Sequence, residues 1–347
     1  MNLITNNNLI IRKKDSTLII IFGVLVCVLM AFLKENIFPE KYFYDSHGLQ
    51  KLIERPNRYY SAESFTNTAT FYRILHIDRI IVAPILALLT YFFVIFKLFK
   101  NYSVNYISFF SYALIVIYSA IAMVYLATFS KDLVLFIIVV VPFVFLEKKS
   151  LIIWTLFVIF YAYVFRTYWF ISIALFWFIK LFIIQSPKRF LLLVPVIYLI
   201  MNVVYHYVFG TSIALIREGA NTDRDIESGQ TIIKTYIEGS NVFLESLNSI
   251  VTLIFLILPI PLFLLLKPFY VILTILITVF FFNFIKLYVK QYKNKDYTNI
   301  FSFVISFMLV QSLFEPDYGS FVRHLSPLYP LIFVCVAKNT KFVETED

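Results

Sequence analysis

The residues best suited to chemistry in this sequence lie together in a short segment, residues 315–324, which reads EPDYGSFVRH. It holds two carboxylates, an arginine and a histidine, and Gly319 permits a tight turn between them. Apolar runs at residues 301–314 and 325–337 flank it. A charge this close to hydrocarbon costs a few kcal/mol, even on the mild insertion scales. These groups are therefore expected to be solvated, paired with one another or functional.

Arg323 allows two interpretations. It is placed to form a structural salt bridge with Glu315 or Asp317, which lie eight and six residues earlier. Alternatively, its planar guanidinium binds a phosphate, with His324 as a hydrogen-bond donor or proton carrier. In the second case, Glu315, Asp317 and Tyr318 are candidates for substrate binding.

Two further sites carry charge next to apolar sequence. Arg166 stands in YVFRTYWF and either extends its side chain to the membrane interface or binds an anionic ligand. Ser130, Lys131 and Asp132 form the tip of a predicted helical hairpin. Asp132 either caps the following helix or lines a substrate cavity together with Lys131.

Two predicted loops contain weaker candidates. Asp45 directly follows the aromatic residues 42–44 and could contact a sugar or act as a base. Arg217 lies close to the membrane end of a loop of balanced charge, in which Arg224 is expected to be solvated. Apolar residues at helical spacing within 232–237 predict a short surface helix that acts as a lid.

The composition places the chain among membrane proteins. Hydrophobic residues make up 61% and charged residues 15% of its 347 residues, and the mean hydropathy is +0.83, which excludes an ordinary soluble domain. The net charge of +9 comes from basic residues scattered through short loops, which favours positive-inside topology over nucleic-acid binding. We expect an all-α integral membrane protein that forms a single domain over residues 1–347.

Cofactor chemistry has no signal in the sequence. Cys27 and Cys335 lie in apolar runs at opposite ends of the chain, so neither a disulfide nor a metal site is expected. We find no glycine-rich phosphate loop, no His/Cys metal set and no Ser-His-Asp set. We therefore expect no metal and no other cofactor.

About ten spanning helices are expected, with both termini in the cytoplasm and outer loops at residues 34–78 and 210–240. The predicted spans are 17–33, 80–99, 106–129, 133–146, 151–165, 168–184, 190–209, 269–285, 300–314 and 325–337. Segment 241–267 is apolar but interrupted by prolines, and it either spans or forms a proline-broken re-entrant or interfacial segment on the outer side. We favour the second, because it keeps the lysines of residues 286–295 in the cytoplasm and places every candidate group above on the outer face.

This layout resembles that of bacterial oligosaccharide repeat-unit polymerases of the Wzy type, which make O-antigen and capsular polysaccharide. The resemblance covers nearly the whole chain: about ten helices in a GT-C-like bundle, a large outer loop in the second half and isolated outward-facing arginines. The most suggestive local matches are FSKD at residues 129–132, FRTY at 165–168 and the segment 315–324.

The resemblance implies a glycosyltransferase on the outer face of the bacterial plasma membrane. A growing glycan on undecaprenyl diphosphate would be transferred onto a single lipid-linked unit, in contact with membrane lipids and a chain-length regulator. Arg166 and Arg323, joined by Arg217, would stabilise the diphosphate leaving group. The base for the acceptor hydroxyl would be one of four carboxylates: Asp45, Asp132, Glu315 or Asp317.

Two other functions remain open. A GT-C-type glycosyltransferase that uses a polyprenyl-phosphate sugar would make Asp45 the central residue. A flippase or other transporter of lipid-linked oligosaccharides predicts charges along the helix interiors, whereas the charges here collect at one edge.

Overall fold

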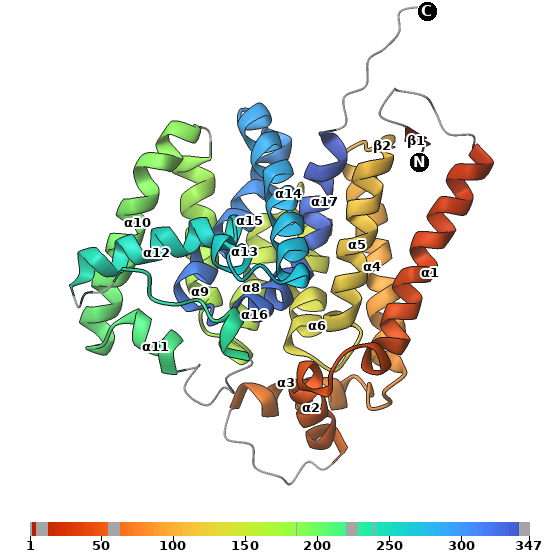
Figure 1. The fold of residues 1–347 in the computed structure, drawn as a ribbon, viewed down its shortest axis with the longest axis horizontal. Helices are drawn as coiled ribbons and strands as arrows, with labels where there is room; N and C mark the ends of the chain where they lie inside the picture. Colours follow the sequence, from red (N-terminus) through yellow and green to blue (C-terminus); the bar gives the residue numbers. More distant parts are fainter. Residues whose placement is uncertain are drawn as a thin grey trace, which may run out of the picture. The chain divides into compact units, whose positions relative to one another are not determined.

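The computed structural model describes residues 2–4, 13–54, 63–184, 186–219, 228–237, 239 and 241–339. The chain forms two compact units (Figure 1). Unit 1 contains Met1–Phe170 and Leu325–Asp347, and unit 2 contains Ile171–His324. Arg224 lies outside the described residues.

Unit 1 is helical apart from a short parallel pair of strands, in which Asn2 pairs with Tyr106. Its elements are β1 (Asn2–Ile4), α1 (Lys13–Ile37), η1 (Glu40–Phe43), α2 (Tyr44–Glu54), α3 (Glu63–Ile74), α4 (Val82–Asn101), β2 (Tyr106–Ser108), α5 (Phe109–Leu126), α6 (Lys131–Leu135), η2 (Phe136–Val140), α7 (Val141–Leu146), α8 (Leu151–Val164), η5 (Ser326–Leu328) and α17 (Tyr329–Lys338). Of these, α17 is the central helix, because it is almost wholly buried and packs against α4 and α5.

Two helices of unit 2 extend into unit 1. The first two residues of α9 and the last residue of α16 belong to unit 1. The elements of unit 2 are α9 (Trp169–Phe178), η3 (Ile179–Ile183), α10 (Pro187–Phe209), α11 (Ile213–Gly219), η4 (Ser228–Thr231), α12 (Val242–Ile257), α13 (Ile260–Phe263), α14 (Pro268–Gln291), α15 (Lys295–Phe314) and α16 (Tyr318–Leu325). The buried centre of this unit is α15, which contacts α11 and α12.

Among the described residues, seven helical segments are long and apolar enough to cross a membrane. They are Asp15–Ile37, Val82–Asn101, Phe109–Leu126, Pro187–Phe209, Pro268–Gln291, Lys295–Phe314 and Tyr318–Lys338. This confirms a multi-pass all-α membrane protein. The count is lower than the ten that we expected, because the predicted spans at 133–146, 151–165 and 168–184 form shorter helices. The 14 residues of α8, for example, rise about 21 Å, less than the roughly 30 Å of hydrocarbon.

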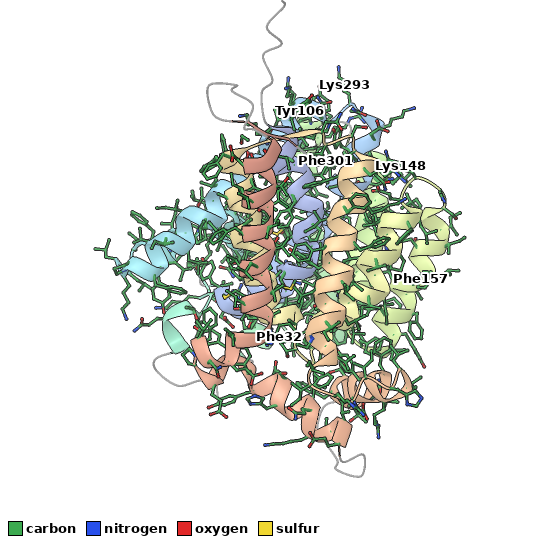
Figure 2. The ribbon with its side chains drawn as sticks, turned by 90° about the vertical axis from the view of Figure 1, so that its right-hand side faces the viewer. Phe32, Tyr106, Lys148, Phe157, Lys293 and Phe301 are labelled. Carbon is green, nitrogen blue, oxygen red and sulfur yellow. The ribbon has the colours of Figure 1, made fainter. Side chains whose placement is uncertain are left out.

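The end of unit 1 where α4 finishes is rich in lysine. Lys148 Nζ donates to the carbonyl of Asn101 (3.0 Å), and Lys338 Nζ donates to the carbonyl of Ser103 (3.0 Å). Figure 2 shows Tyr106 and Lys148 toward this end. These bonds bring the ends of three helices together.

The opposite end of unit 1 carries α2 and α3, which pack on one another. Phe32 lies toward this end in Figure 2. Close by along α1, the buried Lys34 Nζ donates to the carbonyl of Ala127, the residue that ends α5 (2.7 Å). A lysine beside the exposed carbonyls of a helix C-terminus favours the helix dipole, and it ties α1 to α5 here.

Unit 2 also has one end that is rich in lysine. Lysines cluster where α14 turns into α15, with Lys290 in the last turn of α14 and Lys295 at the start of α15. At the other end, Lys267 precedes α14, and its Nζ donates to Gln230 Oε1 in the loop before α12 (2.7 Å). The segment 241–267 therefore starts and finishes beside one loop, and α12 lies across α10 in Figure 1. This geometry favours the re-entrant or interfacial interpretation over a spanning one.

Candidate functional site

The hairpin tip between α5 and α6 is held by hydrogen bonds to α3. Tyr72 Oη donates to the carbonyl of Ser130 (2.8 Å) and accepts from its backbone N–H (3.2 Å). Ser130 Oγ accepts from the backbone N–H of Leu133 (3.0 Å), so Ser130 is the N-cap of α6. The capping role that the sequence suggested for Asp132 thus belongs to Ser130.

Asp132 makes a different interaction, a buried ion pair with Arg166. The Arg166 Nη1 and Asp132 Oδ1 atoms are 2.9 Å apart, and the two side chains are only 11% and 3% exposed. The same nitrogen donates to Tyr168 Oη (3.2 Å). Burial lowers the pKa of the Arg166 guanidinium, but the Asp132 carboxylate, together with Tyr168 and Tyr161, outweighs this and holds the pKa above its ordinary value. Arg166 therefore lies inside the protein and does not extend to the interface.

Lys131 and Asp45 lie at the same end of unit 1. Lys131 Nζ donates to Ser64 Oγ (2.9 Å) and lies 3.7 Å from the centre of the Phe65 ring, a cation–π contact. Asp45 is exposed in the first turn of α2, and the next residue, Ser46, is hydrogen-bonded through its hydroxyl to Thr128. Unit 1 thus brings Asp45 and Lys131 to the end that also carries the ion pair of Asp132 with Arg166.

In unit 2, the segment after α15 forms a carboxylate–imidazole dyad. His324 Nδ1 lies 2.9 Å from Glu315 Oε2, and the side chains are 16% and 1% exposed. With the proton on Nδ1 donated to the carboxylate, Nε2 of a neutral imidazole carries a lone pair. Arg323 Nη2 lies 3.5 Å from that Nε2. Glu315, one of the two carboxylates predicted as partners of Arg323 along with Asp317, contacts His324.

Asp317 has a structural role at the start of α16. Its Oδ1 accepts from the backbone N–H of Ser320 (2.8 Å) and its Oδ2 accepts from Ser320 Oγ (2.7 Å), the pattern of a helix N-cap. A Cβ at Gly319 would lie 3.0 Å from the same Oδ1, so glycine suits this position. The cap fixes the direction of the helix that carries Arg323 and His324.

Replacement of Asp317 by alanine is therefore expected to lower the free energy of unfolding by about 1 kcal/mol, within the usual range of about 0.5 to 2 kcal/mol for a lost cap. Asp317→Asn, whose amide oxygen still accepts from Ser320, should retain most of the stability. Thermal unfolding of the purified protein in lipid nanodiscs measures both. Equal losses for both variants would mean that the charge, and not the cap, matters.

Tyr318 and Arg217 are buried in the same unit, at 1% and 2% exposure. Arg217 Nη1 donates to Thr252 Oγ1 (3.2 Å) and Nη2 donates to Thr235 Oγ1 (3.5 Å). Burial raises the pKa of the Tyr236 phenol, whereas the charge of Arg217 opposes this rise. Arg217 thus joins α11 to α12 and to the loop between them.

The loop at residues 232–237 is extended where the sequence predicted a surface helix. Ile232 forms an isolated antiparallel bridge with Asp317, and the backbone N–H of Ile233 donates to the carbonyl of Pro316 (2.9 Å). Asn248 Oδ1 accepts from the backbone N–H groups of Tyr236 (2.8 Å) and Ile237 (3.3 Å). The helix prediction was wrong because backbone pairing with residues distant in sequence decides this loop. The loop connects α12 to the dyad segment.

The polar face of α12 was not predicted from the sequence. Glu245, Ser246, Asn248, Ser249 and Thr252 are all buried. Their spacing places them on one side of the helix, a signal that the high mean hydropathy of residues 241–267 hid. Among the described residues, no group of three or more His, Cys, Asp and Glu side chains is placed to hold a metal ion.

Comparisons of the chain with models of protein families, with curated proteins and with solved structures give no match.

Proposed function

We propose that the protein polymerises lipid-diphosphate-linked oligosaccharide units on the outer face of the bacterial plasma membrane. The growing glycan is transferred from its lipid diphosphate to a hydroxyl group of a single lipid-linked unit. In this reaction the acceptor oxygen bonds to the anomeric carbon, and the bond from that carbon to the diphosphate oxygen breaks. The diphosphate leaves with the electron pair, and the acceptor hydroxyl loses its proton.

The observation that carries the proposal is the Glu315–His324 dyad. Glu315 is 1% exposed and accepts from Nδ1, an arrangement that orients the imidazole and leaves Nε2 able to accept a proton. His324 retains 16% exposure of its side chain, which gives a substrate access. In this mechanism His324 is the general base, and Glu315 stabilises the imidazolium that forms. The carboxylates at Asp132 and Asp317 are engaged by Arg166 and Ser320 and are weaker candidates.

Arg323 is proposed to bind the diphosphate. It lies next to the dyad, and its guanidinium holds a permanent charge that phosphate oxygens accept bidentately. The leaving group is already anionic, so it requires charge stabilisation more than a proton. In unit 1, the charge of Arg166 is balanced by Asp132, so Arg323 carries this role in the proposal.

Each unit by itself supports this orientation. Lysines gather at the Lys148 end of unit 1 and at the Lys290 end of unit 2, which positive-inside topology assigns to the cytoplasm. The Arg166 pair and the Glu315 dyad lie at the opposite ends of their units. Both termini are then cytoplasmic.

Substitution of Arg323 tests the proposal. Arg323→Ala is expected to lower polymerisation by about 10²- to 10³-fold, the usual effect of losing one group that stabilises developing charge. Arg323→Lys keeps the charge but loses the bidentate geometry, so it should retain part of the activity. The measurement is the ladder of surface glycan on a gel, made from host cells that carry each variant at equal protein level.

The matched control is Arg189→Ala, an exposed arginine at the start of α10 in the same unit. Loss of the ladder with single-unit glycan still delivered supports the proposal. An intact ladder in Arg323→Ala cells contradicts it. Loss of the single-unit product as well points to an earlier step and favours a transferase or flippase.

A further inference from the structure

The polar face of α12 is turned inward, and its apolar face is turned outward. The five buried polar side chains described above lie on one side of the helix. On the other side, Phe243 is 62% exposed and Ile254 is 49% exposed. A helix in or beside a bilayer adopts this orientation when its apolar side faces lipid and its polar side faces a polar interior. The buried side of α12 is therefore mainly polar from Glu245 to Thr252, and it becomes apolar at Leu253 and Leu256.

Glu245 is the charged member of this face. The residue is 8% exposed, and its Oε2 is buried with no hydrogen-bond partner among the described residues. A buried acceptor that lacks a partner costs about 1 to 3 kcal/mol, and a charged one costs more. An ionisable group in such a position indicates a functional site, because a ligand can supply the missing donor.

The neighbours of Glu245 limit the chemistry of that ligand. Asn202 Nδ2 lies 3.4 Å from Ser246 Oγ, so an amide and a hydroxyl meet at the residue that follows Glu245 on the buried face. Thr252, which accepts a hydrogen bond from Arg217, lies two helical turns further along α12 than Glu245, a rise of about 10.5 Å at 1.5 Å per residue. A carboxylate repels a diphosphate but accepts from hydroxyl groups, and amides and hydroxyls bind them as well. This face suits a neutral polyhydroxylated ligand.

We propose that Glu245 and the polar face of α12 bind sugar hydroxyl groups of the acceptor glycan. The inference rests on the proposed function and adds a subsite to it. The loop at 232–237 supports it, because this loop is hydrogen-bonded both to Asn248 of α12 and to Pro316 beside the dyad. Within unit 2, the glycan subsite and the base are thereby held by one segment of chain.

Glu245→Gln tests the subsite, because it keeps the size of the side chain and removes the charge. The full-length protein in lipid nanodiscs would be titrated with two probes: the repeat-unit oligosaccharide released by mild acid from the surface glycan of the host, and farnesyl diphosphate. Glu245→Gln is expected to weaken oligosaccharide binding by about tenfold or more, because hydrogen bonds to a charged acceptor are about twice as strong as neutral ones. Its binding of farnesyl diphosphate should not change. Arg323→Ala should show the reverse pattern.

The control is Asp296→Asn, an exposed carboxylate near the start of α15 in the same unit, which should bind both probes like the unmodified protein. Oligosaccharide binding that is equal in Glu245→Gln and the unmodified protein overturns the subsite and leaves the proposed function standing. The proposed function is contradicted by a different result, namely an intact glycan ladder in Arg323→Ala cells.

A measurement on the unmodified protein covers the case in which Glu245→Gln does not fold. Hydrogen exchange of the α12 amides should slow when the oligosaccharide is added, and exchange in α4 of unit 1 should not change. Unchanged exchange in α12 at an oligosaccharide concentration that saturates binding overturns the subsite.

Discussion

Host cells in which His324 is replaced by alanine are expected to display single-unit glycan with no ladder of longer chains. General-base catalysis contributes about 10²- to 10⁴-fold, so loss of the base should reduce polymerisation by that factor. The reason lies in the geometry, since Glu315 engages Nδ1 at 2.9 Å and leaves the lone pair of the neutral imidazole on Nε2, which lies 3.5 Å from Arg323 Nη2. Gel analysis of the surface glycan at matched protein level measures the effect.

His206→Ala is the matched histidine control, because His206 is exposed in the last turn of α10 in the same unit. Its ladder should equal that of the unmodified protein. Rescue separates catalysis from folding: imidazole added to membranes that contain His324→Ala should restore part of the chain extension. A full ladder in His324→Ala cells would exclude His324 as the base and make the exposed Asp45 the stronger candidate.

The membrane class could be predicted from the sequence because hydropathy is a local property. Seven of the predicted spans are seen as long helices, and each begins or ends within a few residues of its predicted limit or extends beyond it into polar sequence. The three shorter ones failed on length, since α6 begins only at Lys131, α8 ends at Val164 and α9 begins only at Trp169. Local hydropathy detects an apolar run, but it does not show where the helix within that run begins and ends.

The site pairs could not be predicted, because they join residues that are far apart in the chain. Asp132 and Arg166 are separated by 34 positions, and the local sequence around either residue does not indicate the other as its partner. Glu315 and His324 are close in sequence, yet the arginine between them was the more obvious partner for the carboxylate. The structure assigns Glu315 to the imidazole because α16 begins at Tyr318, capped by Asp317, and its turns carry His324 back over Glu315.

Asp132→Ala is expected to destabilise the protein strongly, by more than the loss of the Asp317 cap does. It leaves the Arg166 guanidinium, 11% exposed, without its carboxylate, and removal of one partner of a buried ion pair typically costs about 3 to 5 kcal/mol. The charge cannot be lost by deprotonation instead, since arginine stays protonated in proteins. Unfolding of the purified protein by a denaturing detergent, followed by tryptophan fluorescence, gives the change in free energy of unfolding.

The double variant Asp132→Leu with Arg166→Met distinguishes the effect of one unpaired charge from the effect of losing the whole ion pair. Apolar side chains of similar volume avoid the desolvation cost of both charges, so the double variant should be much closer to the unmodified protein than Asp132→Ala is. Asp78→Ala, an exposed carboxylate in the same unit, should change the free energy by no more than about 0.5 kcal/mol. If the double variant is stable but makes no glycan ladder, the pair serves the reaction as well as the fold. If it is stable and makes a full ladder, Arg166 serves only the stability of the fold, and binding of the diphosphate depends on Arg323.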